Sequence, residues 1–405
     1  MADAVVLGLG SMLGAGVFAA FAPAAAAAGA VGLVAGLVLA ALVAYCNATS
    51  SARLAARYPE SGGTYVYGRE RLGEGWGNLA GWAFVTGKTA SCAAMALAIG
   101  TYAAPAHARI AAAAAVAILT LVNLGGIART ARLTLVFVVL TLTVLALVVG
   151  TGLVAGDPSA GRIADPAHLS PLGVLRAAGL LFFAFAGYAR IATLGEEVRD
   201  PERTIPQAIP RALGIVLLVY AMTGLTALAV LGADRLARPG APLAAVVAAA
   251  GAPALTGVVR AGAVIAVAGV LLALIAGIGR TALAMARRSD LPRPLAVVSP
   301  RHQVPARAEL AVAAVVIALV STADLGWAIG LSSCTVLVYY AIANASALTL
   351  PGPRLVPAAG LAGCLALAAS VPWRSLAAGA VALSIGVIAR AVRIRLASGS
   401  TPHRS

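Results

Sequence analysis

The sequence has little charge and few aromatic residues for its length. Of its 405 residues only 11% are charged and 5% are aromatic, whereas 61% are hydrophobic and the mean hydropathy is +0.96. A water-soluble domain of this size needs far more polar surface than so few charged residues provide. The composition therefore excludes a soluble globular protein and predicts an all-α polytopic membrane protein, whose helices cross the bilayer many times.

The residue types that build reactive centres are also scarce. The four cysteines, Cys46, Cys92, Cys334 and Cys364, all lie inside apolar segments, which predicts neither a disulfide framework nor a metal site. The four histidines fall in predicted loops or near the C-terminus, and no grouping of His, Cys, Asp and Ser forms a catalytic constellation. The sequence thus predicts no enzyme, no cofactor and no metal.

Basic residues outnumber acidic ones by 29 to 14, but they lie in short segments between apolar runs. This placement indicates membrane topology and not a nucleic-acid surface. If the N-terminus is inside, the cytoplasmic segments hold 20 arginines and the opposite side holds 7. The positive-inside rule therefore predicts a multi-pass protein of the cytoplasmic (inner) membrane with both termini in the cytoplasm. The arginines interpreted only as topology determinants with lipid contacts are Arg287, Arg288, Arg390, Arg393 and Arg395.

About 12 apolar windows, each of roughly 20 residues, predict the transmembrane helices. No stretch long enough for a soluble domain interrupts them. The windows cover residues 5–28, 31–52, 79–104, 110–127, 132–154, 172–195, 208–232, 258–284, 309–322, 327–350, 356–371 and 375–393.

The first window contains four glycines within nine residues, Gly8, Gly10, Gly14 and Gly16. Each glycine costs a helix roughly 1 kcal/mol relative to alanine. In hydrocarbon, the backbone leaves helical geometry only where protein or a wet cavity satisfies its amides and carbonyls. The segment therefore predicts a helix that is broken near the middle of the bilayer, where transporters place their substrates. The alternative is a face of small residues that packs against another helix.

The sixth window carries a weaker break signal and runs into a charged loop. It contains Gly187, a single glycine that interrupts a helix only weakly. The paired carboxylates Glu196 and Glu197 follow, and the charged segment after them ends at Pro206.

Five segments together resemble the amino acid–polyamine–organocation (APC) transporter superfamily, and within it the cationic-amino-acid-transporter-like bacterial permeases. They are 10–18 (GSMLGAGVF), 58–65 (YPESGGTY), 183–188 (FAFAGY), 196–206 (EEVRDPERTIP) and 284–292 (AMARRSDLP), in the family's order along the chain. The resemblance implies the LeuT-type fold, a five-plus-five inverted repeat in which helices 1 and 6 are broken.

The same resemblance divides residues 1–405, read as a single membrane transport domain, into repeats. Residues 1–154 would form the first repeat (helices 1–5) and 172–350 the second (helices 6–10). Helices 11 and 12 would follow in 356–393, and 394–405 would be a cytoplasmic tail.

By resemblance, the backbone of the two broken helices binds the substrate. The amides of the first break receive the carboxylate, because helix N-termini favour anions. Carbonyls of the second break receive the ammonium, and an aromatic side chain there covers the substrate unless it only packs in the bundle. The assigned positions are Ser11, Met12, Leu13, Gly14, Ala15 and Gly16 at the first break and Phe182, Phe183, Ala184, Phe185 and Ala186 at the second.

Charged and hydroxyl residues within the windows are the candidates for coupling and gating. Lys88, the single lysine of the chain, lies in the third window, where a bare charge is costly and is usually functional. It is able to titrate, to pair with the substrate carboxylate or to extend to an interface. Proton-coupled relatives carry a lysine in the fifth span, where Thr141 stands here. Tyr188 is a further aromatic candidate for covering the substrate or for gating. Arg190 is able to extend to an interface, to form an ion pair with Glu196 or Glu197, or to face the substrate path, and these two carboxylates would form a cytoplasmic gate or only cap the helix.

These observations predict a secondary active transporter of amino acids that works by alternating access, coupled to protons or by exchange. A permease for polyamines or other organic amines is the alternative within transport. A non-transporting membrane sensor is the alternative outside it. The expected partners are the amino acid or amine, protons and membrane lipids, with no nucleic acid. No acidic residue is placed to select a cationic side chain, and neither substrate identity nor oligomeric state is readable.

Overall fold

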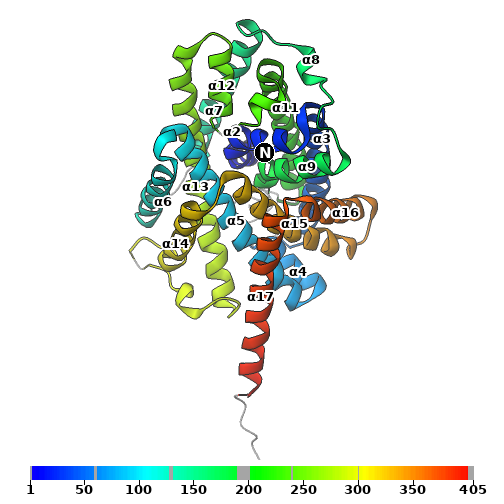
Figure 1. Cartoon of the computed structure of the whole chain (residues 1–405). Helices are drawn as coiled ribbons and strands as arrows, with labels where there is room; N and C mark the ends of the chain where they lie inside the picture. Colours follow the sequence, from blue (N-terminus) through cyan, green and yellow to red (C-terminus); the bar gives the residue numbers. More distant parts are fainter. Residues whose placement is uncertain are drawn as a thin grey trace, which may run out of the picture.

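A computed structural model describes residues 2–58, 62–126, 131–188, 201–238, 240–299 and 301–399. Every regular element in these ranges is a helix (Figure 1), which confirms the predicted all-α class. The longer helices are α1 (Ala2–Met12), α3 (Phe21–Arg57), α5 (Glu74–Ala103), α6 (Ala108–Leu124), α7 (Ala131–Val154), α9 (Pro171–Phe185), α11 (Pro201–Leu236), α13 (Thr256–Arg287), α14 (Ala306–Thr322), α15 (Leu325–Leu348), α16 (Leu355–Ser370) and α17 (Trp373–Gly399). The shorter ones are α2 (Ala15–Ala19), α4 (Thr64–Leu72), α8 (Ala160–Ile163), α12 (Pro242–Ala249) and the 3-10 helices η1 (Pro105–His107), η2 (Ala186–Tyr188), η3 (Pro253–Leu255) and η4 (Arg293–Ala296).

Nine helical stretches within the described ranges are long and apolar enough to cross a membrane. Two shorter apolar helices and α14 cover the first, eleventh and ninth predicted windows. The chain is therefore a polytopic membrane protein, as its composition predicts. The nine stretches are Phe21–Arg57, Glu74–Ala103, Pro105–Leu124, Leu133–Val154, Pro171–Tyr188, Arg203–Leu236, Pro253–Arg287, Leu325–Leu348 and Trp373–Arg393.

The first predicted window, 5–28, is divided among three helices. The chain breaks after Met12, and α3 begins already at Phe21. Within α3, Gly29 has a φ of +68°, and this left-handed kink lies between the first and second windows. A side chain at Gly29 would collide with the carbonyl oxygen of Ala167, so the kink requires glycine.

Two other helices extend past their predicted windows. α11 begins at Pro201, before the window 208–232, and Gly232 (φ +71°) bends it near its end. α17 continues to Gly399, whereas the twelfth window ends at 393 and the predicted tail begins there. The polar end of a helix carries no hydropathy signal, so apolar windows miss it. Figure 1 shows α17 running out from the body of the bundle.

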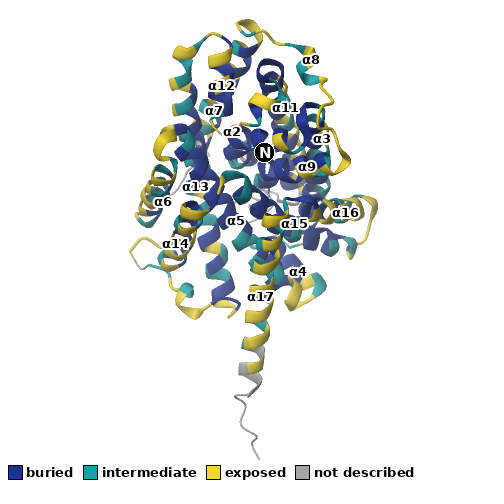
Figure 2. Ribbon diagram, viewed as in Figure 1, coloured by how far each residue is buried: buried dark blue, intermediate teal, exposed yellow. Residues whose placement is uncertain are grey.

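α5 and α15 form the centre of the bundle. Their apolar windows are 83% and 78% buried, whereas those of α6 and α17 are only 22% and 17% buried. Figure 2 shows the same pattern, with buried residues around α2, α5 and α9 and exposed residues along α6 and α17. In a bilayer, exposed apolar surface faces lipid, so α6 and α17 lie at the periphery and the helices around α5 form the interior.

A hydrogen-bonded cluster of buried polar side chains joins α3, α15 and α16. The Asn344 amide nitrogen donates to Oδ1 of Asn47 at 2.6 Å and to the carbonyl of Tyr340 at 3.0 Å. The Ser50 hydroxyl donates to Oδ1 of Asn344 at 2.6 Å, and the Cys364 thiol donates to Oδ1 of Asn47 at 3.2 Å. Such bonds between helices are a main source of cohesion in hydrocarbon, because lipid provides no other partner.

Replacing Asn344 by leucine removes the central residue of this hydrogen-bonded cluster and leaves the Ser50 hydroxyl without its acceptor. We expect the free energy of unfolding to fall by about 1–3 kcal/mol, because buried polar groups lose their partners. Equilibrium unfolding of the purified protein in mixed micelles measures this loss. Ser321→Ala is the control, since the Ser321 hydroxyl is exposed and donates to the Ile317 carbonyl of its own helix. An equal decrease in the free energy of unfolding of the two variants would contradict the stabilising role of the hydrogen-bonded cluster.

Candidate substrate site

The first break separates α1, which ends at Met12, from α2, which begins at Ala15. Gly14 lies between them with φ −141° and ψ −137°, far from helical geometry, and its amide donates to the Met12 carbonyl at 2.8 Å. The Leu13 amide still bonds to the carbonyl four residues earlier, also at 2.8 Å. The first amides of a helix have no partner within it. The first-turn amides of α2, those of Ala15, Gly16 and Val17, therefore have no partner within their own helix.

The second break follows α9, which ends at Phe185 and continues as η2. The second break packs directly against the first break. A Cβ on Gly16 would lie 2.5 Å from the Cα of Ala184, and a Cβ on Gly187 would lie 2.5 Å from the carbonyl carbon of Ser11. Such approaches are possible only for glycine. The two glycine-containing segments singled out in the sequence thus meet in the interior.

Side chains from neighbouring helices donate to the carbonyls that the breaks release. The hydroxyl of Tyr220, on α11, lies 2.6 Å from the Met12 carbonyl oxygen and 3.0 Å from that of Ala184. On the other side, the hydroxyl of Tyr340, on α15, donates to the Ala186 carbonyl at 3.2 Å. Sequence reasoning missed both tyrosines. The only signal was a polar-tipped aromatic residue inside an apolar window, which needs an acceptor when buried.

Lys88 reaches the second break from α5. Its Nζ donates to the Ala186 carbonyl oxygen at 3.0 Å, and its side chain is only 7% exposed. Among the described residues no carboxylate forms an ion pair with it. A carbonyl at the end of a helix carries partial negative charge, which favours a nearby cation. The single lysine of the chain therefore contacts one of the backbone groups that the sequence assigns to the substrate ammonium.

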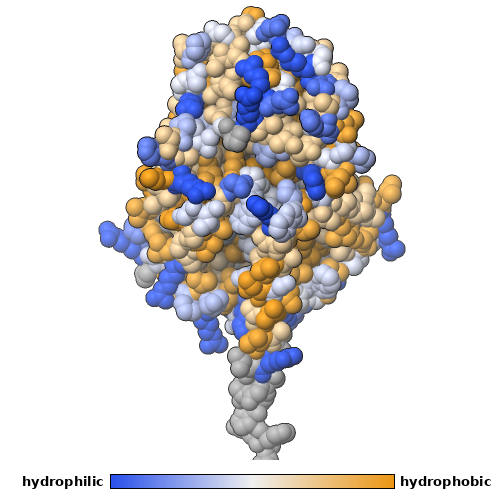
Figure 3. Space-filling view, viewed as in Figure 1, coloured by the Kyte–Doolittle hydropathy of each residue, from blue (hydrophilic) through white to orange (hydrophobic). Residues whose placement is uncertain are grey.

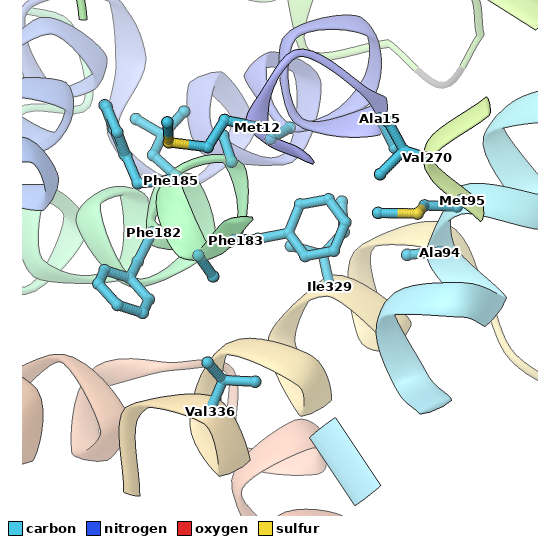
Figure 4. Packing of buried hydrophobic residues seen from close by; sticks show 14 of the residues in the cluster. Met12, Ala15, Ala94, Met95, Phe182, Phe183, Phe185, Val270, Ile329 and Val336 are labelled. Carbon is cyan, nitrogen blue, oxygen red and sulfur yellow. The ribbon is translucent and has the colours of Figure 1, made fainter. Parts of the chain in front are cut away.

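The three phenylalanine candidates of α9 point in different directions. Phe185 packs edge-to-face on Tyr220 with ring centres 5.2 Å apart, and Phe182 packs edge-to-face on Tyr340 at 5.7 Å. Figure 4 shows the Phe183 ring turned the other way, toward the side on which α2, α5, α13 and α15 lie. The labelled residues on this side, all buried and uncharged, are Ala15, Ala94, Met95, Val270 and Ile329.

The other predicted positions lie in and around this centre. The Ser11 hydroxyl donates to the Leu7 carbonyl at 2.8 Å, and the Thr141 hydroxyl on α7 donates to the Phe137 carbonyl at 2.7 Å, each within its own helix. Tyr188 stacks on the ring of Tyr340 with centres 5.0 Å apart. The remaining gating candidates, which lie outside the described residues, are Arg190, Glu196 and Glu197.

A charged cluster joins α4, the end of α13 and α17. The Tyr65 hydroxyl donates to Oδ2 of Asp290 at 2.6 Å, and Arg69 lies 3.3 Å from the same oxygen. Arg390 lies 3.4 Å from the other Asp290 oxygen, and Glu74 pairs with Arg69 at 2.8 Å and with Arg390 at 3.4 Å. Burial and the neighbouring Asp290 carboxylate raise the pKa of the Tyr65 hydroxyl to about 12, so it stays a donor at neutral pH.

This cluster unites two of the segments that carry the resemblance, 58–65 and 284–292, which lie far apart in the chain. It also corrects the interpretation of Arg390 as a topology determinant only, because its guanidinium bridges two carboxylates. The cluster ties α17 to the core of the bundle.

A membrane-spanning helical bundle in which a helix break packs in the interior against the end of a second helix has the architecture of a transporter. The chain belongs to the amino acid permease family, whose model matches residues 1–391. This match confirms the resemblance to the APC superfamily that the sequence motifs indicate. It also establishes a transporter and not an enzyme.

Curated relatives of the chain are also transporters. An uncharacterized transporter of Mycobacterium tuberculosis is 61% identical over 400 residues, which cover 96% of this chain and 90% of the relative. The branched-chain amino acid permease BcaP of Bacillus subtilis is 25% identical over 423 residues, covering 95% of this chain and 90% of the relative. A vacuolar cationic amino acid transporter of Arabidopsis thaliana is 27% identical over 354 residues, covering 80% of this chain and 58% of the relative.

Proposed function

We propose that this protein moves amino acids across the cytoplasmic membrane as a secondary active transporter that works by alternating access. The observation that carries the proposal is the direct packing of the two breaks. The amides of Ala15 and Gly16 lie at the start of one helix, and the carbonyls of Ala184 and Ala186 lie at the end of another. A helix N-terminus favours a carboxylate, and the carbonyls of a helix C-terminus favour an ammonium. An α-amino acid carries both groups on one carbon.

The side chain of the substrate would pack against Phe183. The labelled residues on the side toward which its ring points carry methyl, thioether or aliphatic groups and no charge. A hydrophobic wall of this kind gives no partner to a guanidinium or ammonium, whose burial there would be costly. We therefore assign a neutral, apolar side chain to the substrate.

Coupling to protons or exchange of one amino acid for another would drive the cycle. Lys88 supports proton coupling because its ammonium contacts the Ala186 carbonyl, which is also assigned to the substrate ammonium. Two positive charges at one carbonyl repel, so the protonation of Lys88 and the binding of substrate are linked. The excess of arginines on one side supports cytoplasmic positions for both termini.

A thermal-shift panel on the purified protein tests the substrate class, because a ligand that binds only the folded state raises the melting temperature. We expect α-amino acids with apolar side chains to stabilise the protein and polyamines to have no effect. Stabilisation by polyamines, which lack a carboxylate, would reject the carboxylate assignment and favour an amine permease. A panel without any shift would contradict the proposed site.

Phe183→Ala tests whether the Phe183 ring contacts the side chain of the substrate. We expect affinity for leucine to fall about tenfold, because a contact of about 1–2 kcal/mol between the ring and the ligand is lost. Affinity for alanine, whose methyl group reaches less of the ring, should fall less. Isothermal titration of both ligands measures the ratio. A parallel loss for the two would show that Phe183 stabilises the site without contacting the substrate side chain.

A further inference from the structure

A groove runs along the outside of the bundle between the start of α5 and the second half of α17. It consists of two adjoining cavities of about 380 and 370 Å³ that share Leu79 and Val387. The first is lined by Leu79, Leu383, Ser384, Val387 and Ile388. The second is lined by Gly75, Trp76, Asn78, Leu79, Val387, Arg390 and Ala391. One end is thus apolar, and the other ends in an indole and a guanidinium.

The groove opens toward lipid. Val387 and Ile388 are 51% and 60% exposed although both are aliphatic, and Figure 3 shows hydrophobic surface along this part of α17. Further along, α17 is held against α5, because the Trp82 indole donates to the Ala382 carbonyl at 2.6 Å and the Gly386 backbone packs on the same ring. These contacts hold the two walls at the spacing that leaves the groove open.

The length of the groove matches a lipid chain. Leu383 and Ala391, at its two ends, are eight residues apart on one helix, which is about 12 Å. One leaflet of the hydrocarbon core is about 15 Å deep. The exposed Trp76 lies at the polar end, where amphipathic indoles favour the headgroup level.

Positive charge gathers at that end. The charged cluster described above is neutral, because its two arginines face two carboxylates. Arg287 and Arg288, which are exposed, and Arg393, which is half-buried, add positive charge to it. Arg393 donates to the Ser289 carbonyl, and the Arg288 guanidinium lies 5.8 Å from the Tyr65 ring centre, so both lie beside the cluster. Arg390, the arginine that lines the groove, therefore lies in a region of net positive charge, which complements an anionic headgroup.

We propose that this groove binds one anionic phospholipid, with an acyl chain between α5 and α17 and the phosphate against Arg390 and Arg393. Arginine suits this role because its planar donors match phosphate oxygens. The Arg390 ion pairs, both at 3.4 Å, leave donors available. A lipid held there links α17 to the start of α5 and to the end of α13, where Asp290 lies.

Native mass spectrometry of the detergent-purified protein, titrated with phosphatidylglycerol and with phosphatidylcholine of the same acyl chains, tests the site. We expect one phosphatidylglycerol to be retained more tightly than phosphatidylcholine. Val387→Trp fills the groove and should abolish this retention. Val381→Trp is the matched control, because Val381 is 61% exposed on the same helix and does not line the groove.

Two arginine variants test the headgroup. Arg390→Gln and Arg393→Gln should each weaken phosphatidylglycerol about fivefold, since one arginine near an anionic lipid contributes that much, and leave phosphatidylcholine unchanged. Arg393→Gln keeps the Arg390 ion pairs intact, so it separates binding from folding. Glycerol phosphate without acyl chains should not bind. Equal retention of the two lipids, retention by Val387→Trp, or binding of glycerol phosphate alone would overturn the proposal.

Discussion

Substitution of Gly187 or Gly16 by alanine is expected to eliminate most substrate binding while the protein still folds. A single methyl group at Gly187 would enter the backbone of Ser11, and one at Gly16 would enter that of Ala184. These neighbours are main chain and cannot rotate away, so the two breaks must move apart. Overpacking of this kind costs about 1–3 kcal/mol. Applied to the bound state, this corresponds to roughly ten- to a hundredfold weaker binding.

Equilibrium binding and proteoliposome uptake measure the effect of these substitutions. Gly214→Ala and Gly277→Ala are the controls, because an added Cβ at either position meets nothing within 4 Å. Alanine is the better helix former, so the controls should be as stable as the unmodified protein or slightly more so. Wild-type affinity in Gly187→Ala and Gly16→Ala would show that the close approach of the breaks is not needed for binding.

Lys88→Met is expected to reduce uptake driven by a pH gradient by about ten- to a hundredfold, because a charged hydrogen bond is worth about 1.5–3 kcal/mol. Methionine keeps the length and apolar stem of lysine but has no proton to donate to the Ala186 carbonyl. Removing a buried charge need not destabilise the fold. Uptake into proteoliposomes with an imposed pH gradient measures the loss.

Exchange in the same proteoliposomes is the internal control for Lys88→Met. Exchange of external for internal amino acid needs no net proton movement, so it should persist in this variant. Lys88→Arg keeps the positive charge but does not release a proton near neutral pH, so it should lose gradient-driven uptake as Lys88→Met does. Gradient-driven uptake that is unchanged in Lys88→Met would exclude Lys88 as the coupling group. An unmodified protein that exchanges but shows no gradient-driven uptake would exclude proton coupling altogether.

Most of the fold was predictable because hydropathy reports burial in lipid directly. The windows found every membrane-spanning stretch, and the glycines of segment 10–18 located the first break. The helix boundaries that were predicted wrongly lie where the residues give no hydropathy signal. The polar start of α11 and the end of α17 extend beyond their windows, and the boundary at Gly29 depends on one φ angle.

The candidate site was predictable only as backbone. Sequence reasoning placed the two breaks but not the side chains that approach them, because Tyr220 and Tyr340 come from other helices. Lys88 stood out as an isolated charge, yet nothing in its neighbourhood pointed to the Ala186 carbonyl. Arg390 lies 100 residues from Asp290 along the chain, and such a long-range pair has no local pattern.

Because the chain contains a single lysine, that residue would report on the proposed conformational cycle. An amine-reactive acylating reagent has only two classes of target, the α-amino group and the Lys88 side chain. The second is enclosed between α5, α15 and η2, so it is shielded while the helices stay together. The rate at which Lys88 becomes acylated therefore measures how often the centre of the bundle opens, with no engineered label, and its change with substrate measures how the substrate shifts that motion.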